Sequence, residues 1–270
     1  MNNNTLCIVL SIIILFSFYI FLLEPRLLKT ERCHLYKGDD RLILLQLSDL
    51  HLRDLKIKVE HINKVIARES PDIIAITGDM LDREDDLVNM DNFLSSLARP
   101  CPVIITLGNH DMKVVRSEDD IRALKRLLTK FPEVTLLHNE KARVSRGSRE
   151  FDIIGIADAQ SEYYSPDHIN SMISSADGIR IVLSHNPDAA CDIMPGSCEC
   201  IICGHLHGGQ IWMPFNFEFT LLRNDRLPKK GYKEGLYVIN GNKVYISRGI
   251  GTSLIPARFL SRPEITVFYL

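Results

Sequence analysis

The chain has 270 residues, of which 46% are hydrophobic, 24% charged and 7% aromatic, the composition of a folded protein with a substantial core. This excludes a disordered, collagen-like or small disulfide-stapled protein. The formal net charge is −2, from 32 Lys and Arg against 34 Asp and Glu, so we do not expect nucleic acid as a partner.

The first predicted element is a membrane span at the N-terminus. Residues 5–23 carry no charge and consist mainly of Ile, Leu, Val and Phe. As a helix they would reach about 28 Å, close to the hydrocarbon thickness of a bilayer. A cleaved signal peptide is the alternative, but no Lys or Arg precedes the run and no small-residue cleavage site follows it. We therefore expect an uncleaved anchor.

The flanks of this segment predict its orientation. Arg26, Lys29, Arg32 and Lys37 follow the span, and positive charge stays on the cytoplasmic side. The seven cysteines form no regular disulfide framework, which agrees with a reducing compartment. We expect a single-pass protein of the inner (cytoplasmic) membrane, with residues 1–37 as anchor and juxtamembrane segment and residues 38–270 as one cytoplasmic catalytic domain.

From residue 41 onwards, apolar runs alternate with helical patterns, which predicts an α/β fold with buried strands. Residues 57–67 read as a helix with Val59, Ile62 and Ile66 on one face. Ser117 is the predicted N-cap of a second helix, and the apolar positions 121, 124, 128 and 131 share one face of it.

Five apolar runs each end in side chains of the kinds that bind metal ions. The runs are 42–47, 73–77, 103–107, 179–183 and 200–203, and the side chains after them are Asp49 and His51, Asp79, Asn109 with His110 and Asp111, His185, and His205 with His207. Sites in α/β sheets gather beyond the carboxyl ends of strands, so we expect these endings to meet. Any one of these motifs alone is usually an ordinary turn; five of them in one chain are not.

The donor set predicts the kind of metal. Two Asp carboxylates, one Asn carbonyl and four imidazoles suit Mn, Fe, Zn, Ni or Co rather than Ca²⁺. Seven protein ligands are too many for one ion, but they serve two divalent ions if one carboxylate bridges them.

These motifs resemble those of the calcineurin-like metallophosphoesterase superfamily: Asp-x-His, Gly-Asp, Gly-Asn-His-Asp, a later His, and Gly-His-x-His. The stretches around His185 and His207, with Ser247-Arg248-Gly249-Ile250-Gly251, also resemble a bacterial membrane-associated branch that contains YaeI- and YkuE-type phosphodiesterases and a UDP-diacylglucosamine pyrophosphatase. The resemblance implies a four-layer αββα sandwich, with two mixed sheets face to face and helices outside.

The resemblance also implies roles for the site residues. The first metal would take Asp49, His51, Asp79 and His207, and the second Asp79, Asn109, His185 and His205, with Asp79 bridging. His110 would be the catalytic residue that supports the leaving oxygen, oriented by Asp111, while metal-activated hydroxide attacks phosphorus.

The first functional hypothesis is a membrane-anchored hydrolase of a phosphodiester or pyrophosphate in a lipid-linked nucleotide such as UDP-diacylglucosamine, with manganese among the candidate metals. The alternative is a broad phosphodiesterase or phosphatase for soluble nucleotides or phosphoproteins. A non-catalytic module is a third possibility, but it would lack metal ligands or the catalytic histidine, and here these are all present.

Two further segments carry alternatives. Residues 211–222 are rich in Trp, Met, Phe and Leu and precede Arg223, Arg226, Lys229, Lys230 and Lys233, so they could seat acyl chains or a bilayer surface. The alternative is a packed loop and edge strand, because Phe215, Phe217 and Phe219 alternate as a half-buried strand would. Cys198, Cys200 and Cys203 suggest zinc, but positions 200 and 203 face opposite sides of a strand, which disfavours a shared ion.

Overall fold

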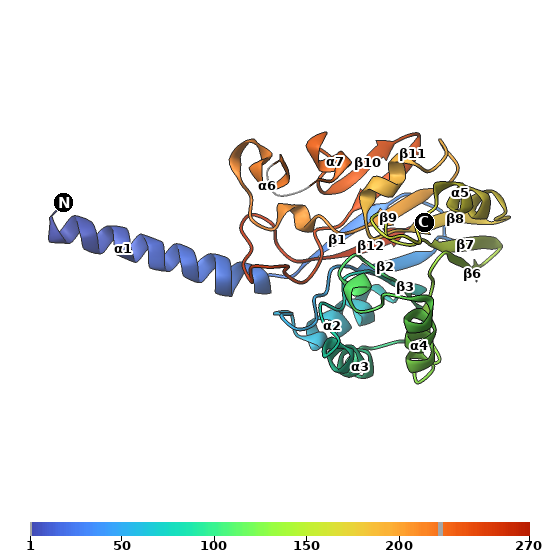
Figure 1. Ribbon diagram of the computed structural model, residues 1–270, viewed down its shortest axis with the longest axis horizontal. Coiled ribbons are helices and arrows are strands. Elements are labelled where there is room, and N and C mark those ends of the chain that lie inside the picture. Colours follow the sequence, from blue (N-terminus) through green and yellow to red (C-terminus); the bar gives the residue numbers. More distant parts are fainter. Residues whose placement is uncertain (1, 221–223) are drawn as a thin grey trace.

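The runs at 42–47, 73–77 and 103–107 form neighbouring parallel strands of one sheet in the computed structural model, which describes residues 2–220 and 224–270 (Figure 1). In the described part of the chain this sheet has the order β1-β12-β2-β3-β4-β5, and β12 is antiparallel to β2. Its strands are β1 (Lys29–His34), β2 (Ile43–Leu47), β3 (Ile73–Thr77), β4 (Val103–Thr106), β5 (Val134–Leu136) and β12 (Glu264–Tyr269).

The second sheet has the order β10-β11-β9-β8-β7-β6. Its central strands β7, β8, β9 and β11 run parallel, and β6 and β10 close its two edges as antiparallel partners. The strands are β6 (Glu140–Arg146), β7 (Arg149–Gly155), β8 (Ile179–Leu183), β9 (Cys200–Cys203), β10 (Gly235–Ile239) and β11 (Asn242–Ile246).

Three apolar clusters show that the two sheets face each other with helices on both outer sides. The middle cluster joins Leu44 and Ile73 of the first sheet to Ile181 and Ile202 of the second. The outer clusters pack helices against the other face of each sheet. The helices are α2 (Val59–Glu69), α3 (Asp86–Ser96) and α4 (Glu118–Leu128) on one side, and α5 (Pro166–Ser174), α6 (Phe217–Thr220) and α7 (Arg226–Lys229) on the other. The expected four-layer sandwich is confirmed.

The predicted helices occur where the apolar spacing placed them. Helix α2 begins two residues later than expected and buries Ile62 and Ile66. Helix α4 begins after Ser117, whose hydroxyl accepts a hydrogen bond from the Asp120 amide, and the Asp120 carboxylate in turn accepts one from the Ser117 amide. This reciprocal pair is a capping box.

The N-terminal segment is an apolar helix that projects from the body (Figure 1). Helix α1 (Asn3–Phe18) continues through a π turn (Tyr19–Leu23) and a 3-10 turn (Glu24–Arg26), giving 24 helical residues that are long and apolar enough to cross a membrane. The first sheet extends into the segment that we assigned to the anchor, because β1 at residues 29–34 pairs in parallel with β12.

The fold bears on two of the local predictions. The strand expected over Phe215, Phe217 and Phe219 is wrong: this stretch is a 3-10 turn (Pro214–Asn216) followed by α6, and only Phe219 among the three is buried. Residues 221–223 of the same predicted segment lie outside the described residues. Cys200 lies in the middle cluster and Cys203 in an outer one, so they face opposite sides of β9 as expected.

Candidate metal centre

The five strand endings predicted to meet do so at the same end of the two sheets. Asp49 and His51 follow β2, Asp79 follows β3 and Asn109 follows β4, all in the first sheet. His185 follows β8, and His205 and His207 follow β9, in the second sheet. The facing sheets therefore bring residues that are up to 158 positions apart, Asp49 and His207, into one cluster.

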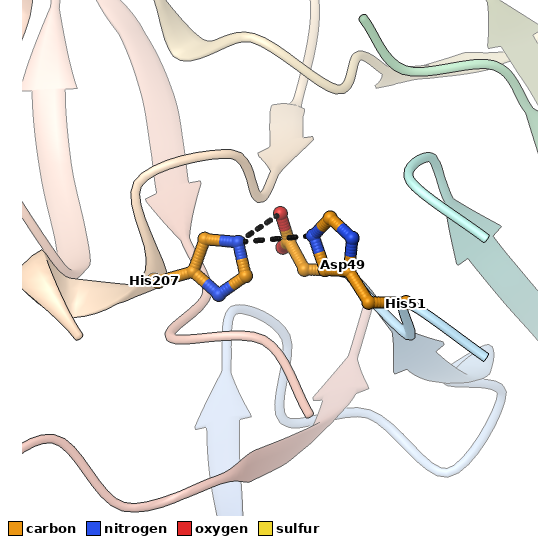
Figure 2. Close-up of side chains that lie close together, drawn as sticks. All are labelled: Asp49, His51 and His207. Atoms are coloured by element: carbon orange, nitrogen blue, oxygen red, sulfur yellow. Dashed lines mark hydrogen bonds and ion pairs between the residues drawn. The ribbon is translucent and has the colours of Figure 1, made fainter. Parts of the chain in front are cut away.

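Asp49, His51 and His207 form the first group of donors (Figure 2). The Nε2 atoms of His51 and His207 are 3.3 Å apart, and His207 Nε2 is 3.4 Å from Asp49 Oδ1. All three side chains are buried, with exposed fractions of 2% or less. Figure 2 shows the two rings and the carboxylate directed toward a common point.

Asp79, His185 and His205 form the second group, and Asn109 joins it. His185 Nε2 lies 3.1 Å from Asp79 Oδ2, 3.2 Å from His205 Nδ1 and 3.2 Å from Asn109 Oδ1. These donors come from four different strand endings.

Asp79 stands between the two groups. Its Oδ2 atom is 3.1 Å from His185 Nε2 in the second group and 3.8 Å from His51 Nε2 in the first. Its other oxygen accepts a hydrogen bond of 2.8 Å from the His110 amide, which holds the carboxylate in place. Asp79 therefore lies within 3.8 Å of an imidazole nitrogen in each group.

The hydrogen bonds on the far side of each ring test whether the site suits cations. His185 Nδ1 lies 3.0 Å from the Thr77 carbonyl and must donate to it, so Nε2 of the neutral ring carries a lone pair. His205 Nε2 lies 3.2 Å from an Asp225 carboxylate oxygen, and donation there leaves a lone pair on Nδ1. These two lone pairs face each other beside an Asn carbonyl and a carboxylate, so the donor set fits a divalent cation.

His51 follows the same rule in the first group. Its Nδ1 lies 3.0 Å from Asp82 Oδ2, and donation to that carboxylate leaves the Nε2 lone pair directed at His207. A carboxylate behind a ligating imidazole fixes its tautomer and raises its basicity. Asp82 and Asp225 thus support the candidate ligands from behind, and the motif analysis identified neither of them in this role.

The backbone at the ligand positions is strained. Asp49, His51, Asp79, His205 and His207 all have positive φ, between 41° and 72°. This region is unfavourable for residues with a Cβ, and such strain concentrates at functional sites. Gly204 leaves the space these turns need, because a Cβ there would overlap the Ser48 hydroxyl and the Asp49 carboxylate.

Asp79 and His185 stabilise each other's charged forms when no cation lies between them. Burial opposes ionisation of Asp79, but the adjacent His185 outweighs it and holds the pKa of this carboxyl well below its usual range. Burial likewise disfavours a charged His185, yet Asp79 raises the pKa of this imidazole well above its usual value. The aspartates therefore impose a negative potential on the rings, which a divalent cation would satisfy equally well.

His110 is positioned by a different carboxylate from the one expected. Its Nδ1 lies 2.5 Å from Asp82 Oδ1, while the second Asp82 oxygen contacts His51. Burial disfavours charge on Asp82, but its hydrogen bonds to His110 and His51 lower its pKa. The expected pairing of His110 with Asp111 is therefore wrong. The sequence does place Asp82 three residues after Asp79 in the same strand ending, which would have made it a candidate partner of the site histidines.

Asp111 has a structural role instead. Its Oδ2 accepts hydrogen bonds of 2.8 Å from the amides of Asp79 and Gly108, and its Oδ1 accepts bonds of 2.9 and 2.8 Å from Met80 and Leu81. Complete burial, together with the charge of Asp79, raises the pKa of Asp111 to about 6. Asp111 thus ties the loop after β3 to the loop after β4, and it shapes the centre through the backbone.

A pocket of about 590 Å³ opens above the centre. Asp79, Asn109, His110, His205 and His207 line its floor. Its walls bring in residues that the sequence analysis did not single out, namely Gln160, Asp188, Asn224, Asp225, Ser253 and Leu254. The pocket is large enough for a phosphoryl group and part of what the phosphoryl group carries.

Comparison with known proteins agrees with this geometry. The family model for the calcineurin-like phosphoesterase matches residues 42–209, the range that contains every candidate ligand. The chain is 33% identical to the uncharacterized metallophosphoesterase YkoQ of Bacillus subtilis, over 84% of this chain and 82% of that one. It is 30% identical to the phosphodiesterase YaeI of Escherichia coli (84% and 81%) and 28% identical to the UDP-2,3-diacylglucosamine pyrophosphatase LpxG of Chlamydia muridarum (91% and 90%).

Proposed function

The chain belongs to the calcineurin-like phosphoesterase family, and on this premise we propose that it is a membrane-anchored phosphoesterase with two metal ions that cleaves a phosphodiester or pyrophosphate bond in a lipid-linked molecule. The observation that carries the proposal is the pair of His/Asp groups that meet at Asp79 on the floor of one pocket. We assign Asp49, His51, Asp79 and His207 to one ion and Asp79, Asn109, His185 and His205 to the other.

Two divalent ions held by these residues would supply an activated water nucleophile and neutralise charge on the phosphoryl oxygens. The chain itself supplies the group for the leaving oxygen. His110 lies at the pocket floor with Nδ1 held by Asp82, so its Nε2 is the atom available to donate a proton to the departing oxygen. Asp82 orients the His110 ring for this transfer through its contact with Nδ1.

Three observations favour a lipid-linked substrate such as UDP-diacylglucosamine. The candidate span would keep the pocket at a bilayer, where a lipid substrate is concentrated. The relative LpxG, by its name, acts on UDP-2,3-diacylglucosamine, and the similarity covers 91% of this chain. Trp212, Phe215 and Phe217, which follow the ligand loop after β9, are exposed. The phosphodiesterase relative YaeI supports the alternative of a less restricted diesterase with the same centre.

The test uses the full chain in detergent micelles, stripped with a chelator and reloaded separately with Mn, Fe, Zn, Co or Ni. We expect hydrolysis to return only with added metal, and UDP-diacylglucosamine to be cleaved faster than bis(p-nitrophenyl) phosphate. Asp79→Ala should lower metal content and abolish turnover, while His61→Ala, an exposed histidine on α2, should change neither. Full turnover by Asp79→Ala would refute the centre, and preference for the soluble diester would refute the substrate class.

A further inference from the structure

Six large apolar side chains stand exposed in two segments, one of which contributes Leu254 to the pocket lining. We call them the apolar rim: Trp212, Phe215, Phe217, Leu254, Ile255 and Leu260. Phe215 is 85% exposed, and Leu254, which lines the pocket, is 99% exposed. Phe215, Leu254 and Leu260 also have positive φ, between 56° and 60°. Bulky residues rarely adopt this backbone, so both the exposure and the strain need a cause outside the domain core.

The two rim segments are joined to each other next to the metal centre. The Trp212 amide donates to the Phe259 carbonyl (3.0 Å), and the Phe259 amide donates to the Gln210 carbonyl (2.9 Å). The side-chain amide of Gln210 also donates to the Ile255 carbonyl (2.7 Å) and accepts from the Ser253 amide (2.7 Å). Gln210 follows the ligand His207 by three residues, so the rim is fixed relative to the centre.

The rim is also joined to the apolar N-terminal helix. The Arg258 amide donates to the Ile20 carbonyl (2.9 Å), and the Ser261 amide donates to the buried Glu24 carboxylate (2.7 Å). The rings of Phe16 and Phe259 pack edge to face with centroids 5.2 Å apart. Figure 1 shows α6 and the loop before β12 at the end of the body from which α1 projects. The helix therefore packs directly against the loop that carries part of the rim.

This contact sets the depth of the rim. If residues 5–23 span the hydrocarbon, Phe16 lies seven residues inside the end at Leu23, or about 10 Å along the helix. Phe259 packs against Phe16 and the Arg258 amide donates to the Ile20 carbonyl, so this part of the loop lies beside the last turns of the span. A loop at this depth would be immersed in lipid.

The only charged side chain in this loop is compatible with an apolar environment. Arg258 is completely buried, and its guanidinium donates to the carbonyls of Arg248, Gly251 and Ser261. A cation satisfied by protein carbonyls can lie at membrane level without exposing its charge to lipid. The sequence 253–260 otherwise contains no charged residue.

We propose that the apolar rim is inserted into the bilayer that the N-terminal helix enters, so that the pocket opens at the lipid surface and receives phosphoesters carried on lipid headgroups. This inference rests on the proposed function, because it requires the helix to span a membrane. It goes further by assigning the membrane contact to residues of the catalytic domain, and by making the loop 253–260 a determinant of substrate class.

Trp212 provides a direct test because it is the only tryptophan of the chain. The full chain is reconstituted in vesicles of phosphatidylcholine and phosphatidylglycerol, with or without bromine on the upper part of the acyl chains. We expect brominated lipid to quench the fluorescence of Trp212. Equal fluorescence in both vesicles would overturn the inserted rim, whether or not the enzyme is active.

The kinetic test uses Phe215→Asn and Leu260→Asn, since asparagine tolerates positive φ and neither residue lines the pocket. Each variant should hydrolyse a vesicle-embedded lipid substrate about tenfold more slowly, because the transfer of one large apolar side chain from water into lipid no longer stabilises the bound state. Hydrolysis of a soluble diester should stay unchanged. Leu127→Gln, an equally apolar and 55% exposed position on α4, is the matched control and should affect neither rate.

The outcomes separate the two proposals. Wild-type protein that cleaves neither substrate with any metal would refute the proposed function, while quenching of Trp212 would still support the rim. Rim variants that cleave the lipid substrate at the wild-type rate would overturn the rim and leave the function intact. Rim variants that change the oligomeric state in detergent, with no quenching of Trp212, would identify a protein partner and overturn the lipid contact.

Discussion

Replacement of Asp82 by asparagine tests the positioning of His110. Asp82→Asn keeps the shape of the side chain but removes a negative charge 2.5 Å from His110 Nδ1 and 3.0 Å from His51 Nδ1. A hydrogen bond to a charged group contributes about 1.5–3 kcal/mol, against about 0.5–1.5 kcal/mol for a neutral one. The change should therefore cost about 1–1.5 kcal/mol at each histidine.

The two histidines together lose about 2–3 kcal/mol, and each 1.36 kcal/mol is a factor of ten in rate, so we expect kcat to fall about 30- to 160-fold for a diester with an alcohol leaving group. A p-nitrophenolate leaving group needs no proton, so for bis(p-nitrophenyl) phosphate only the share that acts through His51 is lost, and kcat should fall by less than about tenfold. The assay compares the two substrates on metal-loaded protein, with bound metal measured in parallel.

Asp111→Asn is the matched control because the expected pair was His110 and Asp111. Here one of two oxygens, each accepting two backbone hydrogen bonds, becomes a donor. Two orphaned amides should cost about 2–6 kcal/mol of folding free energy, seen as a lower melting temperature. If Asp111→Asn spares stability but selectively slows the alcohol leaving group, while Asp82→Asn slows neither substrate, the reasoning about Asp82 is refuted.

Two further predictions concern stability and topology. The Glu69 carboxylate accepts hydrogen bonds from Arg32, Arg68 and Tyr269; although burial opposes its ionisation, these partners lower its pKa to about 2. The ionised Glu69 stabilises the fold fully above its ordinary pKa of 4.5, and this contribution is lost as the pH falls toward 2. Glu69→Gln should therefore reduce the free energy of unfolding by about 1–2 kcal/mol at pH 7 and have no effect near pH 2. Urea denaturation in detergent measures both values. For topology, Ser148→Cys places a thiol at the exposed tip between β6 and β7, and it should react with an impermeant maleimide only after cells are permeabilised. Wild-type protein measures the labelling of the native cysteines. Labelling of the variant above this level on intact cells would place the domain outside.

The local patterns of the sequence predicted much of the fold because they act over short distances. Ser117 and Asp120 form their capping box within one helical turn, and the run at 73–77 forms β3 at those limits. The candidate ligands could be named because Asp49, Asp79, Asn109 and the four histidines each lie beside a glycine or at the end of an apolar run. Such features need no knowledge of distant neighbours.

Three features depended on contacts between distant segments and were not predictable from local pattern. Asp82 and Asp111 are both carboxylates close to ligands, and only the packing of the loop after β3 against the loop after β4 assigns one to His110 and the other to four backbone amides. Strand β1 reads as a charged juxtamembrane segment, since an edge strand has no continuous apolar pattern. The exposure of Leu254 could not be predicted either, because nothing in the local sequence distinguishes it from the buried leucines.

The sequence by itself determined the chemistry of the centre, because residue types decide which ions and protons a site can hold and those types recur at strand ends in a readable pattern. The tertiary structure decided which side chains and segments contact each other. Which carboxylate faces which imidazole, and which apolar loop lies beside the N-terminal helix, follow from two sheets closing on each other and bringing residues 16 and 259 into contact. The chain can specify such pairings only through the packing of the whole domain.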